Sequence, residues 1–274
     1  MSGAVERIGT AMAGRLCCSL RKSGCRAAAI HCRPAEAHHM RHPHTHEGIY
    51  LSTQHKSTLH LQVVSDMICP WCFNGKRSLD QALKVLASQG VDVEVEWLPY
   101  QLNPAMPAEG MDRKEFRTMR FGWDNALAMD ARAVEAGHRT GAEFNYQLQS
   151  RTPNTVASHA LARLAYVEGG AALQGRVVDA LFAAYFTNGK DISDQAVLER
   201  IADEAGMEPG AVNRSLPAHA EVRKLDAEIR SMGLSGVPSY LVNGKLLFSG
   251  SQDVEGYVRS LTSAAKSKVA GIPA

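Results

Sequence analysis

Alternating hydrophobic and polar residues mark two stretches of the chain, with a helical pattern between them. Residues 59–65 and 91–98 alternate with a period of two, which is typical of strands with one buried face. Residues 72–88 instead place leucines at helical spacing, and this pattern ends near Gly90. The order strand, helix, strand predicts a parallel βαβ crossover.

The region after the second strand has helical periodicity and no strand pattern. A proline-containing loop comes first, and helices are then expected over residues 112–137, 152–168, 171–186, 193–205 and 217–232. Ser193 is the expected N-cap of the fourth of these helices. We therefore predict an all-helical subdomain at this point of the chain.

The C-terminal part is predicted to complete the sheet with a hairpin. Residues 239–242 and 245–248 are strand-like, and they flank Asn243-Gly244, a strong signal for a two-residue hairpin turn. A last helix is expected to follow, with Ser251 as its N-cap.

These elements predict an α/β fold whose sheet domain is discontinuous in sequence. The sheet domain would comprise residues 59–104 and 234–266, and the helical insertion residues 105–233. Residues 1–58 are expected to form a basic, histidine-rich extension of low order, and residues 267–274 a tail.

Charge sets the N-terminal extension apart from the rest of the chain. Residues 1–58 hold eight Lys and Arg against three acidic residues, whereas the remainder holds 22 basic and 25 acidic residues. Three interpretations of the extension are open: an organelle-targeting peptide, a disordered tail, or an upstream stretch that is not translated, with the true start at Met40. The slightly acidic body is not expected to bind nucleic acid.

Hydropathy bears on where the protein is located. No run approaches the 18 to 20 apolar residues of a membrane-spanning helix, so no membrane partner is expected. A secretory signal is disfavoured, because no apolar segment of about 7–15 residues follows the first basic residues. We predict a cytoplasmic protein, or a mitochondrial or plastid protein if residues 1–40 are a transit peptide.

The body of the chain has only two cysteines, Cys69 and Cys72, and both lie at the first strand-to-helix junction. A Cys-x-x-Cys pair in this place is typical of redox chemistry. The positive end of a helix favours the thiolate of Cys69, which is the nucleophilic form, and Cys72 is placed to resolve a mixed disulfide. Pro70 suits the first turn of a helix.

A zinc site is the competing explanation of the cysteine pair. It would need two more ligands, and the body has no second Cys-x-x-Cys and no pair of histidines. The cysteines at positions 17, 18, 25 and 32 lack zinc-ligand spacing, and the histidine cluster between His38 and His46 would hold a metal only weakly. We therefore expect no metal site.

Several motifs taken together resemble a known family. They are Asp66-x-x-Cys69-Pro70-Trp71-Cys72-x-x-Gly75-Lys76, Gln101-Leu102-Asn103-Pro104, Asn154-Thr155-x-x-x-His159, Leu181-Phe182-x-x-Tyr185-Phe186-x-x-Gly189-x-Asp191-Ile192, Gly236-Val237-Pro238 and Ser249-Gly250-Ser251-Gln252. Over roughly residues 59–265 the chain resembles DsbA-like oxidoreductases, and in particular their FrnE-type branch. This branch is related to 2-hydroxychromene-2-carboxylate isomerases and kappa-class glutathione transferases. The resemblance implies a thioredoxin fold (βαβ…ββα) with an inserted all-helical subdomain.

The resemblance also implies roles for residues around the cysteines. Pro238 would be a cis proline facing them, and the backbone of Val237 would pair with an extended substrate or with glutathione. The further candidates for substrate binding are Trp71, Ser251 and Gln252, and the candidates for active-site support are Asp66, Pro70 and His159. Plainer roles remain open for some of them: packing for Trp71, capping for Ser251 and Asp66, and a hydrogen-bonded helix histidine for His159.

Three functions are compatible with these observations. The first is a thiol–disulfide oxidoreductase without a cofactor, acting on a disulfide- or thiol-bearing protein or on glutathione, as a monomer or homodimer. The second is a glutathione-dependent isomerase or transferase for a small aromatic substrate; the relatives with that activity have serine at the position of Cys69, so the presence of both cysteines favours dithiol chemistry. The third is a non-catalytic chaperone or binding module on the same fold.

Overall fold

A mixed four-stranded sheet lies at the centre of residues 58–269, the part of the chain that the computed structural model describes. The predictions for the N-terminal extension and for the end of the tail fall outside these residues. The strand order is β2-β1-β5-β6, with β1 (Leu59–Ser65), β2 (Val93–Pro99), β5 (Ser239–Val242) and β6 (Lys245–Ser249). β1 and β2 are parallel, whereas β5 pairs antiparallel with both β1 and β6. The predicted α/β fold is confirmed.

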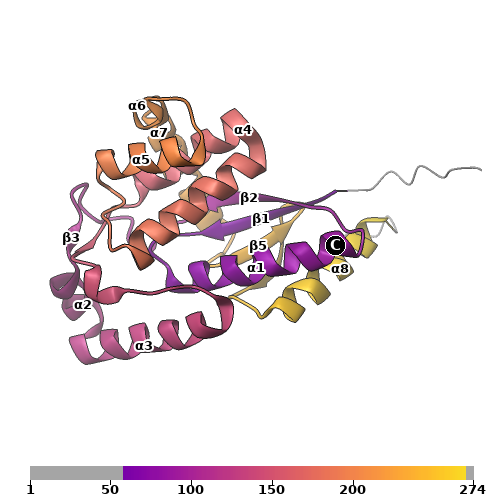
Figure 1. The fold of residues 1–274 in the computed structure, drawn as a ribbon, viewed down its shortest axis with the longest axis horizontal. Coiled ribbons are helices and arrows are strands. Elements are labelled where there is room, and N and C mark those ends of the chain that lie inside the picture. The colour runs from indigo at the N-terminus through magenta and orange to yellow at the C-terminus, as the bar shows by residue number, and fades with distance from the viewer. Residues whose placement is uncertain (1–57, 270–274) are drawn as a thin grey trace, which may run out of the picture. The chain divides into compact units, whose positions relative to one another are not determined.

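Helices cover both faces of this sheet, with α1 and α8 together on one side (Figure 1). α1 (Pro70–Ser88) packs against α8 (Val254–Val269), and Leu61 and Val63 of β1 are buried in the same core cluster as residues of these helices. A second cluster joins Val64 and Leu241 to Ile229 of α7 (Ala218–Ser231). β1 is therefore buried on both faces, and this fixes the strand that leads into the cysteine pair.

One of the two edge strands of the sheet, β2, is covered by α4 (Val156–Phe182), which lies along it. The side-chain amide of Gln174 donates to the Trp97 carbonyl at 2.9 Å, and its Oε1 accepts the Trp97 N–H at 2.8 Å. Unpaired backbone groups on an edge strand can pair with another chain. Gln174 pairs with two such backbone groups of Trp97, so this part of the edge is not open to pairing with another chain.

Two short strands contradict the prediction of an insertion without strands. β3 (Met111–Asp112) and β4 (Arg151–Thr152) form an antiparallel pair. Each has only two residues, which is too few to produce a visible alternation in the sequence. The rest of the insertion is dominated by helices, as predicted.

Several helices of the insertion have other bounds than predicted. α2 (Arg113–Phe121) and α3 (Trp123–Thr140) replace the single helix expected over 112–137, because Gly122 adopts a φ of 77° between them. The two helices expected from 152 to 186 lie in α4, and its non-helical backbone angles at Gly169 and Gly170 mark the break between them where it was predicted, although α4 begins at Val156 and ends at Phe182. The remaining short elements are a 3-10 turn, a π-helical turn, α5 and α6: Tyr146–Leu148, Ala183–Thr187, Gln195–Ala205 and Ala211–Ser215.

Both predicted N-caps are wrong. The carboxylate of Asp194, not the hydroxyl of Ser193, accepts a backbone N–H from the first turn of α5, at 3.0 Å. At α8 the carboxylate of Asp253 accepts a first-turn N–H at 2.7 Å, two residues beyond Ser251. In both cases a nearby aspartate takes the role, since aspartate and serine are similarly good N-caps and composition alone does not choose between them.

A cluster of aromatic rings anchors the first turn of α1. Phe73, next to Cys72, stacks on Phe182 and Phe186 with ring centroids 5.4 and 5.6 Å apart, and meets the edge of Phe144 at 5.4 Å. Phe73, Phe182 and Phe186 are almost completely buried. Such buried aromatic pairs add to the burial energy of the rings. The start of α1 is thus held by the insertion as well as by the sheet.

Close packing explains the glycine at position 75, which follows the cysteine pair on α1. A Cβ added to Gly75 would lie 2.7 Å from the Tyr240 hydroxyl and 3.0 Å from the Tyr257 hydroxyl. These two buried hydroxyls hydrogen-bond to each other, so neither moves away freely. The chain therefore needs a glycine here for space rather than for an unusual backbone angle.

We expect Gly75→Ala to lower the free energy of unfolding by about 1–2 kcal/mol. Alanine gains roughly 0.5–1 kcal/mol from helix propensity, but overpacking costs about 1–3 kcal/mol. Urea unfolding of both proteins measures the difference. Gly175→Ala on α4 is the matched control, because a Cβ there meets nothing within 4 Å. A Gly75→Ala protein as stable as the control variant would contradict the packing argument.

Candidate functional site

The cysteine pair sits where β1 passes into α1. Cys69 is the N-cap of α1, with extended backbone angles (φ −89°, ψ 114°), and Pro70 is the first helical residue. The Cys69 carbonyl accepts the N–H groups of Cys72 at 3.1 Å and Phe73 at 3.2 Å. The first turn has no acidic residue, so the positive end of the helix next to the Cys69 sulfur is not neutralised by its own helix.

Both thiols are free and both side chains lie inside the protein. Cys69 is 4% exposed and Cys72 1%. Burial raises the pKa of the Cys72 thiol, and the neighbouring Cys69 raises it further, while the nearby Ser65 side chain and Asp66 backbone act against the shift. Cys72 therefore favours the protonated form.

Val237 and Pro238 face this pair from the other end of the chain. The Cys69 thiol donates to the Val237 carbonyl, with the sulfur 3.7 Å from the oxygen, and the Val237–Pro238 peptide bond is cis. The Pro238 carbonyl accepts the Gly250 N–H at 2.8 Å. The structure thus places Val237, with the cis bond to Pro238 directly after it, beside the Cys69 thiol.

Asp66 and His159 form a buried pair directly behind the cysteine loop. The Asp66 carboxylate accepts the Leu102 N–H at 2.7 Å, and its other oxygen lies 3.3 Å from His159 Nε2. Both side chains are almost completely buried. The carboxylate thus does not cap its own turn; instead it links the turn before Cys69 to the loop at Leu102 and to α4.

A cavity of about 390 Å³ opens beside Cys69. Trp71, which is 41% exposed, forms part of its mouth, and Gly236 and Val237 contribute backbone to it. The opposite wall comes from the insertion. Its apolar part consists of Phe116, Phe121 and Met129, with Tyr185 also contributing, and Leu102 from the loop after β2 adds to the lining.

The charged part of the same wall is basic. Arg117, Arg120 and Arg132 line the cavity together with one carboxylate, Asp130. Asp130 is already engaged, because it accepts from Arg113 at 2.5 Å and from Arg117 at 2.9 Å. Burial lowers the pKa of Arg117 below its ordinary value, and the ion pair with Asp130 acts against this shift.

This basic wall was not predicted from the sequence. A signal was present, because residues 113, 117 and 120 are all arginine and the spacing i, i+4, i+7 places them on one face of a helix. What the spacing does not reveal is that this face of α2 is turned toward the cysteine pair.

Ser251 and Gln252 lie outside the cavity. The Ser251 side chain packs beside Gly75 on α1, and the Gln252 side chain lies against Gly256 in the first turn of α8. Neither contributes to the wall beside Cys69. Of the candidate substrate-binding residues, the structure groups Trp71 and Val237 around this cavity and leaves these two apart.

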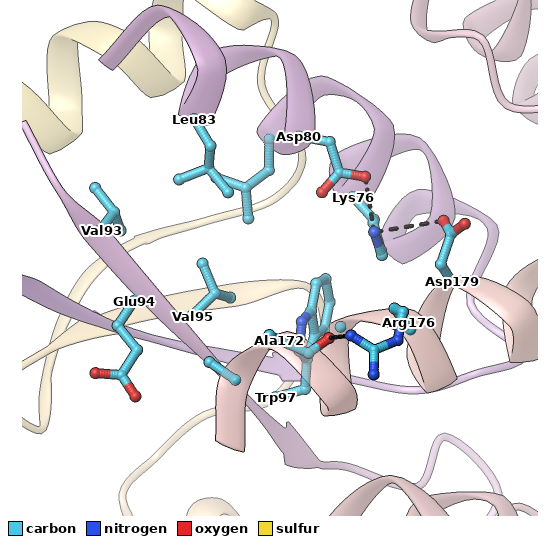
Figure 2. A pocket seen from close by; sticks show the side chains of 13 residues that line it. Lys76, Asp80, Leu83, Val93, Glu94, Val95, Trp97, Ala172, Arg176 and Asp179 are labelled. Carbon is cyan, nitrogen blue, oxygen red and sulfur yellow. Dashed lines mark hydrogen bonds and ion pairs between the residues drawn. The ribbon is translucent and has the colours of Figure 1, made fainter. Parts of the chain in front are cut away.

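A larger hollow of about 590 Å³ lies between α1, β2 and α4 (Figure 2). It shares no lining residue with the cavity beside Cys69. Lys76 on its rim is paired with Asp80 at 2.7 Å and Asp179 at 3.4 Å, as Figure 2 shows. Since this lysine is held by two carboxylates and no nucleophile lines the hollow, the chemistry of the site belongs to the cysteine cavity.

Residues 58–269 have neither a clustered set of metal-ligating side chains nor a helix suited to a membrane. Within them, no group of three or more His, Cys, Asp or Glu side chains is arranged to hold a metal ion. None of the helices described combines the length and apolar character that crossing a bilayer requires.

Comparison with known proteins places the geometry in context. Residues 60–262 match the family model described as DSBA-like thioredoxin domain. The chain is 26% identical over 216 residues to the uncharacterized protein YwbO of Bacillus subtilis (strain 168), an alignment that covers 77% of this chain and all of that protein.

Among solved structures, the chain is similar to the probable DsbA oxidoreductase SCO1869 from Streptomyces coelicolor. The identity is 25% and the TM-score 0.64, over 75% of this chain and 89% of that one. The cytosolic disulfide reductase DsbM from Pseudomonas aeruginosa, solved with GSH, is 17% identical with a TM-score of 0.52, over 77% of this chain and 100% of that one. The second likeness concerns the fold alone.

Proposed function

Because this chain belongs to the DSBA-like thioredoxin domain family, we propose that it is a thiol–disulfide oxidoreductase of the FrnE-type branch, with Cys69 and Cys72 as its catalytic residues. One observation carries the proposal: Cys69 caps the N-terminus of α1 and opens onto a cavity, with Cys72 buried one turn behind it. The likeness to a probable DsbA oxidoreductase supports the same chemistry. A cytoplasmic location is part of the proposal.

The reaction begins at the Cys69 sulfur. Its thiolate attacks one sulfur of a substrate disulfide, so that a bond forms between Cys69 and that sulfur while the other half leaves as a thiolate. Cys72 then loses its proton and attacks the Cys69 sulfur, which forms the Cys69–Cys72 disulfide and releases the second half. Two electrons pass from the dithiol to the substrate, and the reverse sequence oxidises substrate thiols.

The surrounding residues support these steps by position. The Val237 carbonyl, which accepts from the Cys69 thiol, is a backbone group that an extended substrate can pair with beside the sulfur. Pro70 leaves the first helical position without an N–H that would need a partner. Asp66 and His159 hold the turn before Cys69 against α4 and Leu102. Trp71 offers a partly exposed ring at the cavity mouth.

Replacing Cys72 by Ser should trap the mixed disulfide. The Cys69 sulfur still attacks, but nothing inside the protein resolves the product, because the structure places no third cysteine of residues 58–269 near it. Trypsin cuts after Lys56 and Lys76, so both cysteines fall in one peptide, residues 57–76, apart from the four N-terminal cysteines. After exposure to hydroxyethyl disulfide, the mass of this peptide should increase by one mercaptoethanol adduct.

The Cys69→Ser protein is the matched control and should show no adduct on this peptide, because Cys72 is buried and predominantly protonated.

A second candidate function, a glutathione-dependent isomerase or transferase, is favoured by the enclosure of Cys69 at the base of a cavity of small-molecule size. It makes the opposite prediction: turnover of a small aromatic substrate would need glutathione and would survive in Cys72→Ser.

A further inference from the structure

We propose that the cavity beside Cys69 selects small disulfides with anionic end groups, and that Arg120 and Arg132 are the residues that set this preference. The inference rests on the proposed function, since it names the substrate class for the same two cysteines. It follows from the size of the cavity, from its balance of charges and from the place of its apolar surface.

The size of the cavity favours a small molecule over a folded protein. Cys69 is only 4% exposed, so a partner must reach into the cavity to touch its sulfur. The volume, about 390 Å³, lies within the range of about 300–1,000 Å³ that is typical of small-molecule sites. Trp71 and Phe121 are among the residues that line it.

The charges around the cavity are strongly unbalanced. Three arginines and one aspartate line it, and the aspartate is shared by Arg117 and the neighbouring Arg113. Asp66 is the other nearby carboxylate, but it lies buried behind the cysteine loop, with its oxygens held by the Leu102 N–H and by His159. A concave wall of one sign raises the local concentration of opposite charge.

Arg120 and Arg132 are the cations that remain available. Within residues 58–269, no ion pair or side-chain hydrogen bond to a protein group holds either arginine, and both side chains are exposed. The guanidinium carbon of Arg120 lies 6.0 Å from the ring centroid of Phe121. Arg117, in contrast, is committed to Asp130 and to the Ala126 carbonyl.

Apolar surface accompanies the arginines along the same wall. Leu102, Phe116 and Met129 line the cavity together with Arg120 and Arg132. A ligand with a hydrocarbon body and charged ends satisfies both kinds of surface at once. Guanidinium groups pair with carboxylates in a forked geometry, so carboxylate ends are the expected match.

Three disulfides of nearly the same size test the proposal: 3,3′-dithiodipropionate as a dianion, hydroxyethyl disulfide as a neutral molecule and cystamine as a dication. Each is mixed with the reduced full-length protein, the reaction is stopped by alkylation, and peptide 57–76 is analysed by mass for the Cys69–Cys72 disulfide. Each rate is divided by the rate of the same disulfide with free mercaptoethanol, which removes differences in intrinsic reactivity.

For the wild-type protein we expect a normalised rate about tenfold higher for the dianion than for the neutral disulfide, and the lowest rate for the dication. Added salt should reduce the advantage of the dianion. In the Arg120→Gln/Arg132→Gln protein, the normalised rate with the dianion should fall about tenfold, while the rate with the neutral disulfide stays unchanged. Arg139→Gln, on the same helix as Arg132 but paired with Glu135 on the surface, is the control and should behave as wild type.

Equal normalised rates for the three disulfides, or a dianion rate that the double substitution leaves intact, would overturn the inference. An equal fall in the rates of the doubly substituted protein with the neutral and the anionic disulfide would also overturn the inference, because that pattern indicates damage to the fold rather than lost charge recognition. Failure of the proposed function looks different: peptide 57–76 would not be oxidised by any of the three disulfides.

Discussion

Replacing Cys69 by Ser should lower the rate of disulfide exchange by about 100-fold or more. The thiolate is the nucleophile in this chemistry, and a serine hydroxyl at the same place does not form a disulfide at all. Loss of a nucleophile removes most of the rate that an active site supplies. The measurement is the catalysed reduction of hydroxyethyl disulfide by dithiothreitol, in a background where the four N-terminal cysteines are serine.

The Cys72→Ser protein separates two roles in the same assay. It should retain the first attack and lose efficient turnover, because external dithiothreitol must then resolve the mixed disulfide. Thermal unfolding curves that match wild type would show that neither substitution disturbs the fold. Turnover at the wild-type rate in Cys69→Ser would refute the proposed role of this cysteine.

The sheet was predictable because its strands carry local signals. β1 and β2 alternate with a period of two, and Asn243-Gly244 marks the hairpin between β5 and β6. β3 and β4 were missed because their pairing depends on contacts distant in sequence rather than on local alternation. The break within α4 was predictable as well, because the helical pattern stops at Gly169 and Gly170, where the backbone angles are non-helical.

The candidate site was predictable only in part, for a similar reason. Cys69 and Cys72 have a local signature, whereas Val237 reaches them because β1 and β5 are neighbours, with Val64 opposite Ser239. Family resemblance supplied that pairing; periodicity does not contain it. Which helix face borders the cavity is likewise a tertiary property, so the arginines of α2 were overlooked, and the sequence did not show that Ser251 is absent from the cavity lining.

Replacing Asp130 by Ala should destabilise the protein by about 3–5 kcal/mol. Asp130 and Arg113 are both buried, and the carboxylate bridges Arg113 at 2.5 Å and Arg117 at 2.9 Å. Removing one partner of a buried ion pair leaves charge without compensation, which costs far more than the intact pair contributes. Here two guanidinium groups lose the same partner, although the Gln149 side chain and the Tyr146 ring still contact Arg113.

Urea unfolding measures this cost, and Glu135→Ala on the same helix is its control. Glu135 pairs with Arg139 on the exposed side of α3, where an ion pair is worth about 0.2–1 kcal/mol, so that variant should unfold close to wild type. The contrast bears on function, because Asp130 joins α3 to α2 and so holds in place the wall that carries Arg120. If Asp130→Ala proved as stable as Glu135→Ala, the wall would have to be held by other contacts, and its arginines would not be positioned by this ion-pair network.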